Sequence, residues 1–326
     1  MKVAQIENGI LVIKERENEA LNNRKGAVVK VLGCGLCGSD IVKLKHNLAK
    51  EGTVLGHEIV AQIVDIDSDT DFKNGDIIVT SHHIPCGKCE YCKNGNVSMC
   101  RHFKKTNIKP GGFSELVFVS EEHLKNVAYI KPQNLTDDEA AFYEPLGCCV
   151  RAIHRAYLNQ NSTALVIGLG SIGILMAQAL KALGIKVVGC DLISSRVELL
   201  KKLGIEAFHV NEMCESIKVD GVFMTSGSDK AIETALKYVR DGGKILVFSS
   251  TPQNFGYANN EIYYRELTVL GSYSPSPKDL KESLELLTSK QVRVENLSNI
   301  YTLEQIQKAI NDTVENKIIK AYIKIN

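Results

Sequence analysis

A glycine-rich turn between an apolar run and an amphipathic segment constrains the fold of this chain most. Its spacing is Gly168-x-Gly170-x-x-Gly173, within "LVIGLGSIGILMAQALKALGIKVVGCD". In such a setting the first glycine permits a tight turn and the second lets the backbone approach a phosphate group. The third allows the helix to pack closely on the strand. The motif therefore predicts a strand, a helix and a second strand, with a pyrophosphate bound at the helix N-terminus.

The second strand of this unit, "KVVGCD", ends in an acidic residue, Asp191. A carboxylate there accepts hydrogen bonds from ribose hydroxyls and repels a 2′-phosphate, which favours NAD over NADP. A glycine-rich turn in a plain α/β domain is the alternative. We expect the dinucleotide site to consist of Gly168, Gly170, Ser171, Ile172, Gly173, Asp191 and Arg196.

The hydrophobic pattern changes along the chain. The first ~145 residues contain brief β-branched runs separated by Gly, Asn and Asp, which are typical of short strands and turns. Apolar strands then alternate with longer helical patterns to about residue 275, as in a doubly wound parallel sheet. The last ~50 residues hold two helical patterns and a final strand. The sequence thus predicts an α/β protein with a β-rich region beside a parallel-sheet domain.

Bulk composition excludes several classes of protein. A net charge of +1 gives no electrostatic basis for binding nucleic acid or an anionic membrane. No apolar run reaches the ~18 residues that span a bilayer, and the N-terminus does not resemble a secretory signal, so we expect a cytoplasmic protein. Cytosolic thiols stay reduced, so the ten cysteines favour metal binding or thiol chemistry over disulfides.

Four of these cysteines lie in the segment "CGKCEYCKNGNVSMC", at positions 86, 89, 92 and 100. The spacing C-x2-C-x2-C-x7-C can close a tetrahedral shell of four thiolates around zinc. Four protein ligands leave no open position, so this site would be structural. An iron–sulfur cluster is the competing metal hypothesis, and free core cysteines are the remaining alternative.

A second set of candidate ligands consists of Cys37, His57 and Glu144. Together they form the Cys/His/carboxylate shell of a catalytic zinc with one position left open. Glu58 follows His57 and could exchange with Glu144 or with water at the metal. Glu144 precedes Pro145, which predicts an extended Glu144 and a helix beginning at Pro145.

Two further histidines, His82 and His83, precede the cysteine-rich segment. The four-cysteine shell is already complete, so we expect them to have a role in a turn or on the surface. Two lysine-rich segments, 43–50 and 102–109, could bind an acidic group of a substrate. Solvated surface lysines are the simpler interpretation of such runs.

These motifs carry a family resemblance. The order "GLCGSD", "GHE", the four-cysteine run, "GGFSEL", "EPLGCC", "GLGSIG" and "RELTVLGSY" resembles the zinc-dependent medium-chain dehydrogenase/reductase family over essentially the whole chain. The Glu-Pro-Leu form of the third ligand is similar to that of the sorbitol and polyol dehydrogenase branch, which includes enzymes for sugar-alcohol phosphates.

The resemblance implies a GroES-like catalytic domain at 1–147 and 275–326, with a structural zinc lobe at 86–100. The NAD-binding Rossmann domain would be 148–274. Cys37, His57 and Glu144, with Glu58 nearby, would hold the catalytic zinc, and Ser39 would lie at the substrate oxygen. The implied activity is hydride transfer between NAD and a secondary alcohol, a polyol or sugar alcohol with or without a phosphate. Subunits would pair into a homodimer or homotetramer.

One departure from the family pattern concerns protons. Many members have a histidine five residues after the zinc cysteine, whereas this chain has Val42. The proton would then leave through water or through another group such as His46. A catalytically silent NAD-binding protein of the same fold is the alternative function, although an open zinc shell has no purpose in such a protein.

Overall fold

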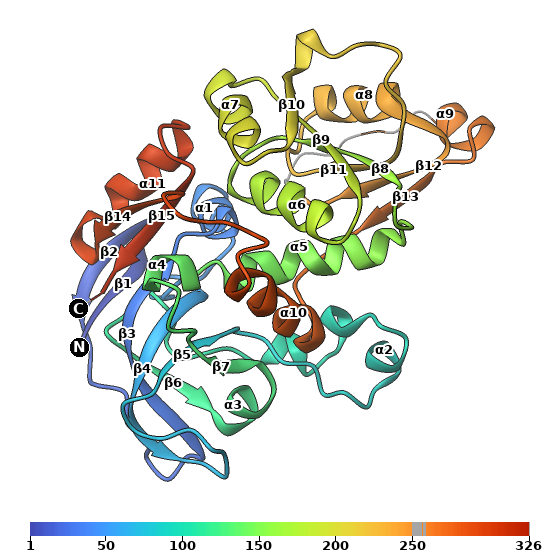
Figure 1. Cartoon of the computed structure of the whole chain (residues 1–326). Helices are drawn as coiled ribbons and strands as arrows, with labels where there is room; N and C mark the ends of the chain where they lie inside the picture. The colour runs from blue at the N-terminus through green and yellow to red at the C-terminus, as the bar shows by residue number, and fades with distance from the viewer. Residues whose placement is uncertain (250–255, 257–258, 326) are drawn as a thin grey trace. The chain divides into compact units, whose positions relative to one another are not determined.

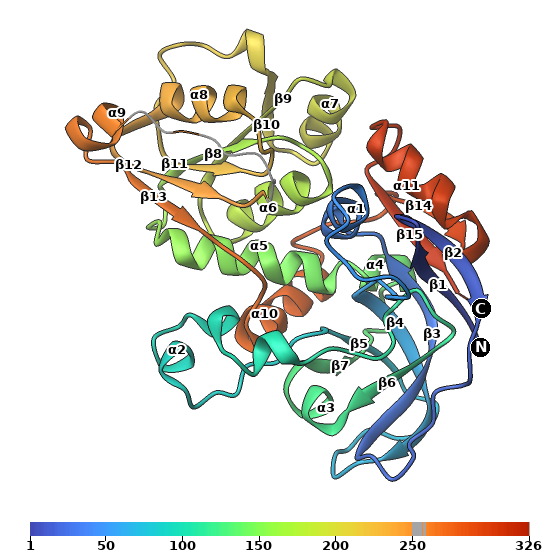
Figure 2. The same cartoon turned by 180° about the vertical axis from the view of Figure 1, so that it is seen from behind.

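The computed structural model describes residues 1–249, 256 and 259–325 (Figures 1 and 2). The chain forms two compact units. The first comprises Met1–Pro145, Ser276–Thr288 and Val294–Asn326, and the second comprises Leu146–Pro275 and Ser289–Arg293. Each unit is thus built from segments that are separate along the chain.

The second unit is organised around a six-stranded sheet whose strands all pair in parallel. The order is β10-β9-β8-β11-β12-β13, so the first strand, β8, is central and the order reverses between β8 and β11. This reversal is where open parallel sheets bind ligands. The strands are β8 (Thr163–Ile167), β9 (Lys186–Asp191), β10 (Glu206–His209), β11 (Val219–Met224), β12 (Val239–Val247) and β13 (Thr268–Gly271).

Helices connect these strands, and Figure 1 shows α5 and α8 on opposite sides of the sheet. The helices are α5 (Tyr143–Ala156), α6 (Ser171–Ala182), α7 (Ser194–Lys202), α8 (Asp229–Tyr238) and α9 (Asn259–Tyr264), with a 3₁₀ turn η3 (Val210–Glu212). Strand residues such as Leu165 and Val222 are buried, as expected for a parallel sheet covered on both faces. The predicted doubly wound sheet is confirmed.

The first unit is built on a mostly antiparallel seven-stranded sheet in the order β14-β15-β3-β4-β5-β7, with β6 also paired to β3. A separate two-stranded sheet joins β1 to β2. The strands are β1 (Lys2–Glu7), β2 (Ile10–Glu15), β3 (Gly26–Gly35), β4 (Glu58–Asp67), β5 (Ile77–Thr80), β6 (Leu116–Ser120), β7 (Ala128–Ile130), β14 (Ser298–Thr302) and β15 (Lys320–Lys324).

Short helices fill the connections of the first unit. They are α1 (Gly38–Lys45), α2 (Glu90–Lys93), α3 (Glu121–Val127), α4 (Asp137–Ala140), α10 (Pro277–Thr288) and α11 (Ile306–Val314), with 3₁₀ turns η1 (Val97–Met99), η2 (Phe103–Lys105) and η4 (Leu303–Gln305). One continuous core, which includes Val29, Ile59 and Phe113, joins the N-terminal strands to β15 and α11. The C-terminal segment therefore completes the β-rich unit.

One predicted helix boundary is wrong. Helix α5 begins at Tyr143 and not at Pro145, so Glu144 lies in its first turn instead of in an extended segment before it. Proline is tolerated there because a first-turn residue has no intrahelical partner for its backbone N–H. Within the described residues, no helix combines the length and the apolar character that crossing a bilayer requires.

Candidate metal centres and cofactor site

The four predicted cysteines converge in a small lobe of the first unit. Cys89 is the N-cap of α2, Cys92 lies within that helix, and Cys100 follows η1. Their sulfur atoms and that of Cys86 all lie within 4.8 Å of one another. The Cys89–Cys92 and Cys86–Cys92 sulfur distances are 3.5 and 4.0 Å. Ligands at about 2.3 Å from one tetrahedral ion lie about 3.8 Å apart, which is close to these two distances, so the donor set fits zinc.

The electrostatics of this lobe also suit a bound cation. Burial and the neighbouring thiols Cys89 and Cys100 raise the pKa of Cys92 to about 12. Burial opposes ionisation of Cys100 too, but the backbone N–H groups of Cys86 and Phe103 lower its pKa to about 6. These close sulfur atoms cannot all ionise unless a positive ion compensates the charge.

The second cluster starts at helix α1. Cys37 is the N-cap of this helix, and its sulfur accepts hydrogen bonds from the backbone N–H of Ser39 (3.5 Å) and from Ser39 Oγ (3.3 Å). Asp40 closes a capping box by accepting from the Cys37 N–H at 3.3 Å. The sequence "LCGSD" thus holds the sulfur of Cys37 in a fixed direction through its own backbone.

His57 faces Cys37 from the residue just before β4. Ligand atoms of Cys37, His57 and Glu58 all lie within 4.8 Å of one another. On the other side of the ring, His57 Nδ1 lies 3.6 Å from Asp40 Oδ1, and the Asp40 side chain is fully buried. A carboxylate behind a histidine orients the ring so that its other nitrogen can face a metal. Sequence reasoning missed this contact between Asp40 and His57.

The charges around His57 also favour a cation. Burial alone would lower the pKa of His57, but the Asp40 carboxylate and the Cys37 thiolate outweigh it and raise this pKa well above its usual value. Burial likewise opposes ionisation of Asp40, yet His57 lowers the pKa of Asp40 below its usual value. The cluster therefore stabilises positive charge at its centre, which suits a divalent ion.

A buried ion pair, Lys320–Glu58, completes the cluster. The two side chains are 5% and 1% exposed. Lys320 opens β15 and Glu58 opens β4, and β3 lies between these strands. The pair reaches across Gly35 of β3, where an added Cβ would overlap Glu58 Oε2. Burial lowers the pKa of Lys320, but Glu58, Cys37 and Glu144 outweigh it and keep the lysine charged.

Glu144 is buried in the first turn of α5. Its ligand atoms do not belong to the group that Cys37, His57 and Glu58 form, but its charge acts on Lys320. The described residues therefore bring together the ligand atoms of Cys37, His57 and Glu58. Glu144 lies outside this group, and its charge helps to raise the pKa of Lys320. Glu144 remains a proposed ligand.

The two histidines before the cysteine lobe do not fit a surface role. The His82 ring centroid lies 4.6 Å from that of His57, and the His83 ring lies 4.0 Å from that of His82. Burial and the nearby His57 lower the pKa of His82 well below its usual value. Sequence reasoning missed this contact because the histidines are distant from His57 along the chain.

The predicted cofactor loop lies between β8 and α6 in the second unit. Gly168 has φ +91°, a conformation that favours glycine, and a Cβ at Gly173 would collide with Gly168 O. A Cβ at Gly170, the N-cap of α6, would meet no atom within 4 Å, so space remains above the helix N-terminus. Ser171 and Ile172 open this helix. The loop fits a pyrophosphate approached by backbone N–H groups.

Asp191 ends β9 with its carboxylate turned toward this loop. Oδ2 accepts from Leu169 N at 2.5 Å and Oδ1 accepts from Ile193 N at 2.8 Å. Each carboxylate oxygen has a further lone pair, so ribose hydroxyls can still donate to it. Arg196 Nη1 lies 3.8 Å from Asp191 Oδ2, which reduces the net negative charge there.

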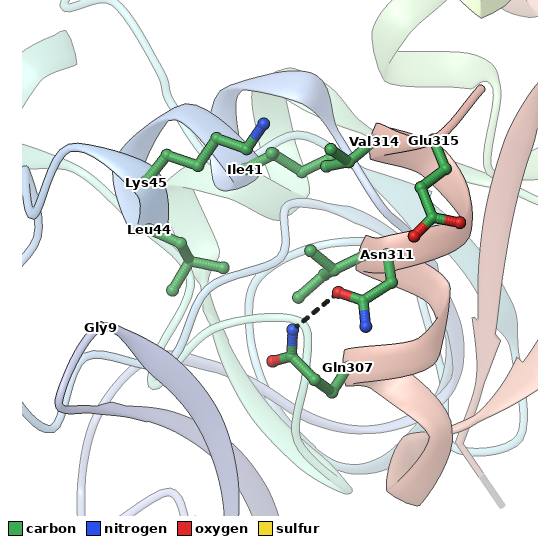
Figure 3. A pocket seen from close by; sticks show the side chains of 9 residues that line it. Gly9, Ile41, Leu44, Lys45, Gln307, Asn311, Val314 and Glu315 are labelled. Carbon is green, nitrogen blue, oxygen red and sulfur yellow. Dashed lines mark hydrogen bonds between the residues drawn. The ribbon is translucent and has the colours of Figure 1, made fainter.

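A hollow of about 220 Å³ lies elsewhere in the first unit, between the later part of α1 and helix α11 (Figure 3). The residues that line it are Gly9, Ile41, Leu44, Lys45, Gln307, Ile310, Asn311, Val314 and Glu315. Gln307 and Asn311 hydrogen-bond to each other at 3.3 Å on its wall. None of the predicted site residues lines this hollow, so it is separate from the metal cluster.

Comparison with known families gives two matches. Residues 23–129 match the model of the alcohol dehydrogenase GroES-like domain, and residues 171–289 match the zinc-binding dehydrogenase model. Among curated proteins, D-arabitol-phosphate dehydrogenase of Enterococcus avium is 30% identical over 92% of this chain and 90% of its own. Sorbitol dehydrogenase of Halalkalibacterium halodurans is 30% identical over 90% of each chain.

Solved structures of dehydrogenases are also similar to this chain. Galactitol-1-phosphate dehydrogenase from Escherichia coli superposes with a TM-score of 0.86 at 25% identity, over 100% of both chains. An alcohol dehydrogenase from a Thermus species has a TM-score of 0.85 at 24% identity, also over 100% of both chains. The latter likeness concerns the fold alone.

Proposed function

Because the chain belongs to the zinc-dependent medium-chain dehydrogenase/reductase family, we propose that it interconverts a secondary alcohol of a polyol and the corresponding ketone with NAD. The observation that carries the proposal is the convergence of ligand atoms from Cys37, His57 and Glu58 within 4.8 Å, in a buried and anionic setting. A cofactor loop with the correct glycine geometry accompanies it in the second unit.

The family match confirms the predicted resemblance, the GroES-like and Rossmann fold class, and the expectation of an oxidoreductase that uses zinc and NAD. The silent NAD-binding alternative is not favoured, since the similar proteins are named as dehydrogenases. In such enzymes bound zinc polarises the alcohol oxygen, and the nicotinamide ring accepts the hydride.

The protein's own contribution begins with orientation. Asp40 fixes the His57 ring, and the α1 N-terminus fixes the Cys37 sulfur. We propose that Ser39 relays the proton of the substrate hydroxyl: its Oγ accepts that proton while its own hydroxyl proton passes on to water. The contact of Ser39 Oγ with Cys37 Sγ at 3.3 Å supports this role, because it keeps the hydroxyl beside the metal ligand.

We propose that the proton passes from Ser39 to water. Val42 has no donor or acceptor, and His46 is an exposed residue at the C-cap of α1. His46 lies seven residues after Ser39, a rise of about 10 Å along the helix at ~1.5 Å per residue. That separation is too long for direct transfer from Ser39, so His46 is not part of the proposed relay.

The substrate class rests on the relatives. D-arabitol-phosphate, sorbitol and galactitol-1-phosphate are the alcohols in the names of three similar proteins. We therefore propose a polyol or sugar alcohol, free or phosphorylated. We also propose two zinc ions per chain, Glu144 as a further ligand of the catalytic zinc, a cytoplasmic location and a homodimer or homotetramer. No nucleic acid or membrane partner is expected.

A turnover screen tests this function. Purified protein loaded with zinc is assayed with NAD and a panel of polyols, their phosphates and simple primary alcohols. At least one polyol or polyol phosphate is expected to have a higher kcat/KM than every primary alcohol. Absence of NAD-dependent turnover across the panel, in both directions, would reject the proposed function.

Nucleotide preference is tested in the same assay. NAD is expected to outperform NADP, because the Asp191 carboxylate faces the ribose position. Asp191→Gly removes the carboxylate that would repel a 2′-phosphate, so the variant is expected to narrow the gap in kcat/KM between NAD and NADP. A variant with an unchanged NAD:NADP ratio of kcat/KM would show that Asp191 does not set the preference.

A further inference from the structure

His82 borders the metal cluster without belonging to it. It follows β5, and its ring centroid is 4.6 Å from that of His57 with an interplanar angle of 46°. The ligand atoms of His82 are not part of the group formed by Cys37, His57 and Glu58. The His82 ring therefore lies directly beside a residue of the metal cluster.

The segment around His82 is held in place from two sides. His123 Nε2 donates a hydrogen bond to the His82 carbonyl at 3.1 Å, and Ser120 Oγ donates to His123 Nδ1 at 2.7 Å. His83 Nδ1 donates to the carbonyl of Thr106. The backbone is thus fixed by its neighbours, and the His82 ring is free of any role in holding it.

The Nδ1 atom of His82 is buried and has no hydrogen-bond partner among the described residues. Most buried polar atoms in proteins are paired, so an exception beside a reaction centre calls for an explanation. Nδ1 of an imidazole can donate or accept, as can an alcohol hydroxyl. A substrate with a hydroxyl at this point would satisfy the nitrogen.

We propose that His82 is a substrate-binding residue whose Nδ1 hydrogen-bonds the hydroxyl on the carbon next to the reacting carbon. This inference rests on the proposed function. A site built to pair with a hydroxyl discriminates against the analogue that lacks it, because the protein group is then left buried and unpaired. His82 would thereby select polyols over simple secondary alcohols.

The test compares two alcohols that differ by this one hydroxyl, 2,3-butanediol and 2-butanol. His82→Phe keeps a ring against His57 and His83 but removes both nitrogens. It is expected to lower kcat/KM for the diol by about 10- to 100-fold, while 2-butanol changes by about twofold or less. Equal losses for both alcohols, or no loss for either, would overturn the proposal.

Two matched variants separate hydrogen bonding from packing. The amide of asparagine occupies the position of Nδ1, whereas that of glutamine reaches the position of Nε2. His82→Asn is therefore expected to retain most of the preference for the diol, and His82→Gln to lose it. If both variants behaved like His82→Phe, or both like the unmodified protein, the assignment to Nδ1 would be wrong.

A binding measurement provides a readout other than turnover. Calorimetric titration of 2,3-butanediol into the zinc-loaded enzyme with NADH is expected to show weaker binding for His82→Phe, with unchanged zinc content. Unchanged diol affinity in this variant would overturn the inference. An unmodified enzyme that binds the diol but turns over no polyol would instead reject the proposed function.

Discussion

The two metal clusters lie in the same unit but are built in opposite ways. The four-cysteine lobe takes its ligands from 15 consecutive residues, 86–100, arranged around one short helix and one 3₁₀ turn. Three of its cysteines are partly exposed. The Cys37/His57/Glu58 cluster joins a helix cap, a strand end and the C-terminal strand through Lys320, and its charged groups are largely buried. The ligands of the four-cysteine lobe are neighbours along the chain, whereas those of the Cys37/His57/Glu58 cluster are brought together by tertiary packing.

The difference indicates different roles. Four sulfur atoms that close on one ion leave no position for a substrate. The second cluster supplies fewer protein ligands and surrounds them with positioning groups, Asp40 and Lys320, which fix each ligand from behind. We therefore propose that the lobe serves folding and the buried cluster serves chemistry, and single substitutions can separate these two roles.

The largest effect is expected for Cys37→Ser. A catalytic metal is worth several kcal/mol of transition-state stabilisation, and ~1.4 kcal/mol is tenfold, so turnover is expected to fall about a thousandfold or more. Steady-state kinetics measure the fall, and circular dichroism checks that the fold is kept. The exposed Cys214 provides the control Cys214→Ser, which is expected to be fully active. A fully active Cys37→Ser would refute the catalytic assignment.

Breaking the buried ion pair is expected to have the largest effect on stability. Lys320→Met leaves Glu58 buried and unpaired, which is expected to cost about 3–5 kcal/mol of unfolding free energy. Denaturant titration measures this loss. Lys30→Met, on an exposed position of the adjacent strand β3, is the control.

A double variant sharpens the test of the ion pair. Adding Glu58→Gln to Lys320→Met removes the unpaired charge, so part of the lost stability is expected to return. If Lys320→Met cost no more than Lys30→Met, the pair would not stabilise the cluster.

Cys100→Ser is expected to show the reverse of Cys37→Ser, with stability lowered and activity per folded molecule kept. Structural zinc can contribute ~10–16 kcal/mol in small domains. Even a loss of ~3 kcal/mol would lower the Tm of a unit of this size by about 6–12 °C. Differential scanning calorimetry measures the shift. An unchanged Tm together with lost turnover would reverse the roles assigned to the two clusters.

The smallest effect is expected for Asp40→Asn. The amide still fills the space behind His57 but removes the charge, and loss of such a positioning group typically lowers metal affinity about 10–100-fold. Competition with a chromophoric chelator measures the affinity. Asp65→Asn, on an exposed position of β4, is the matched control. Equal affinities in the two variants would show that Asp40 does not act on the metal.

The same contrast explains what the sequence could predict. The lobe follows from spacing alone, and the glycine loop follows from a motif whose strand and helix are its immediate neighbours. Cys37 and His57 were identified because they lie in family motifs. Asp40 could have been identified as the capping-box partner of Cys37, since that interaction is local.

The contacts of Lys320 and His82 could not be predicted from local motifs. Lys320 opens the short strand β15, in which Tyr322 pairs with Gly35 of β3, and Gly35 pairs in turn with Glu58 of β4. Lys320 reaches Glu58 across the space that Gly35 leaves without a side chain. The contact of His82 with His57 depends on the pairing of β5 with β4, which places the two strand ends side by side. Both contacts depend on sheet register, which spacing along the chain does not encode.

The zinc content of Cys37→Ser beside that of the unmodified protein tests the central claim most directly. Both are purified after supply of excess zinc and passed through gel filtration, and metal per chain is measured by atomic emission. The account predicts two zinc ions in the unmodified chain and one in Cys37→Ser, retained by the four-cysteine lobe. One ion or none in the unmodified chain, or two in the variant, would contradict it.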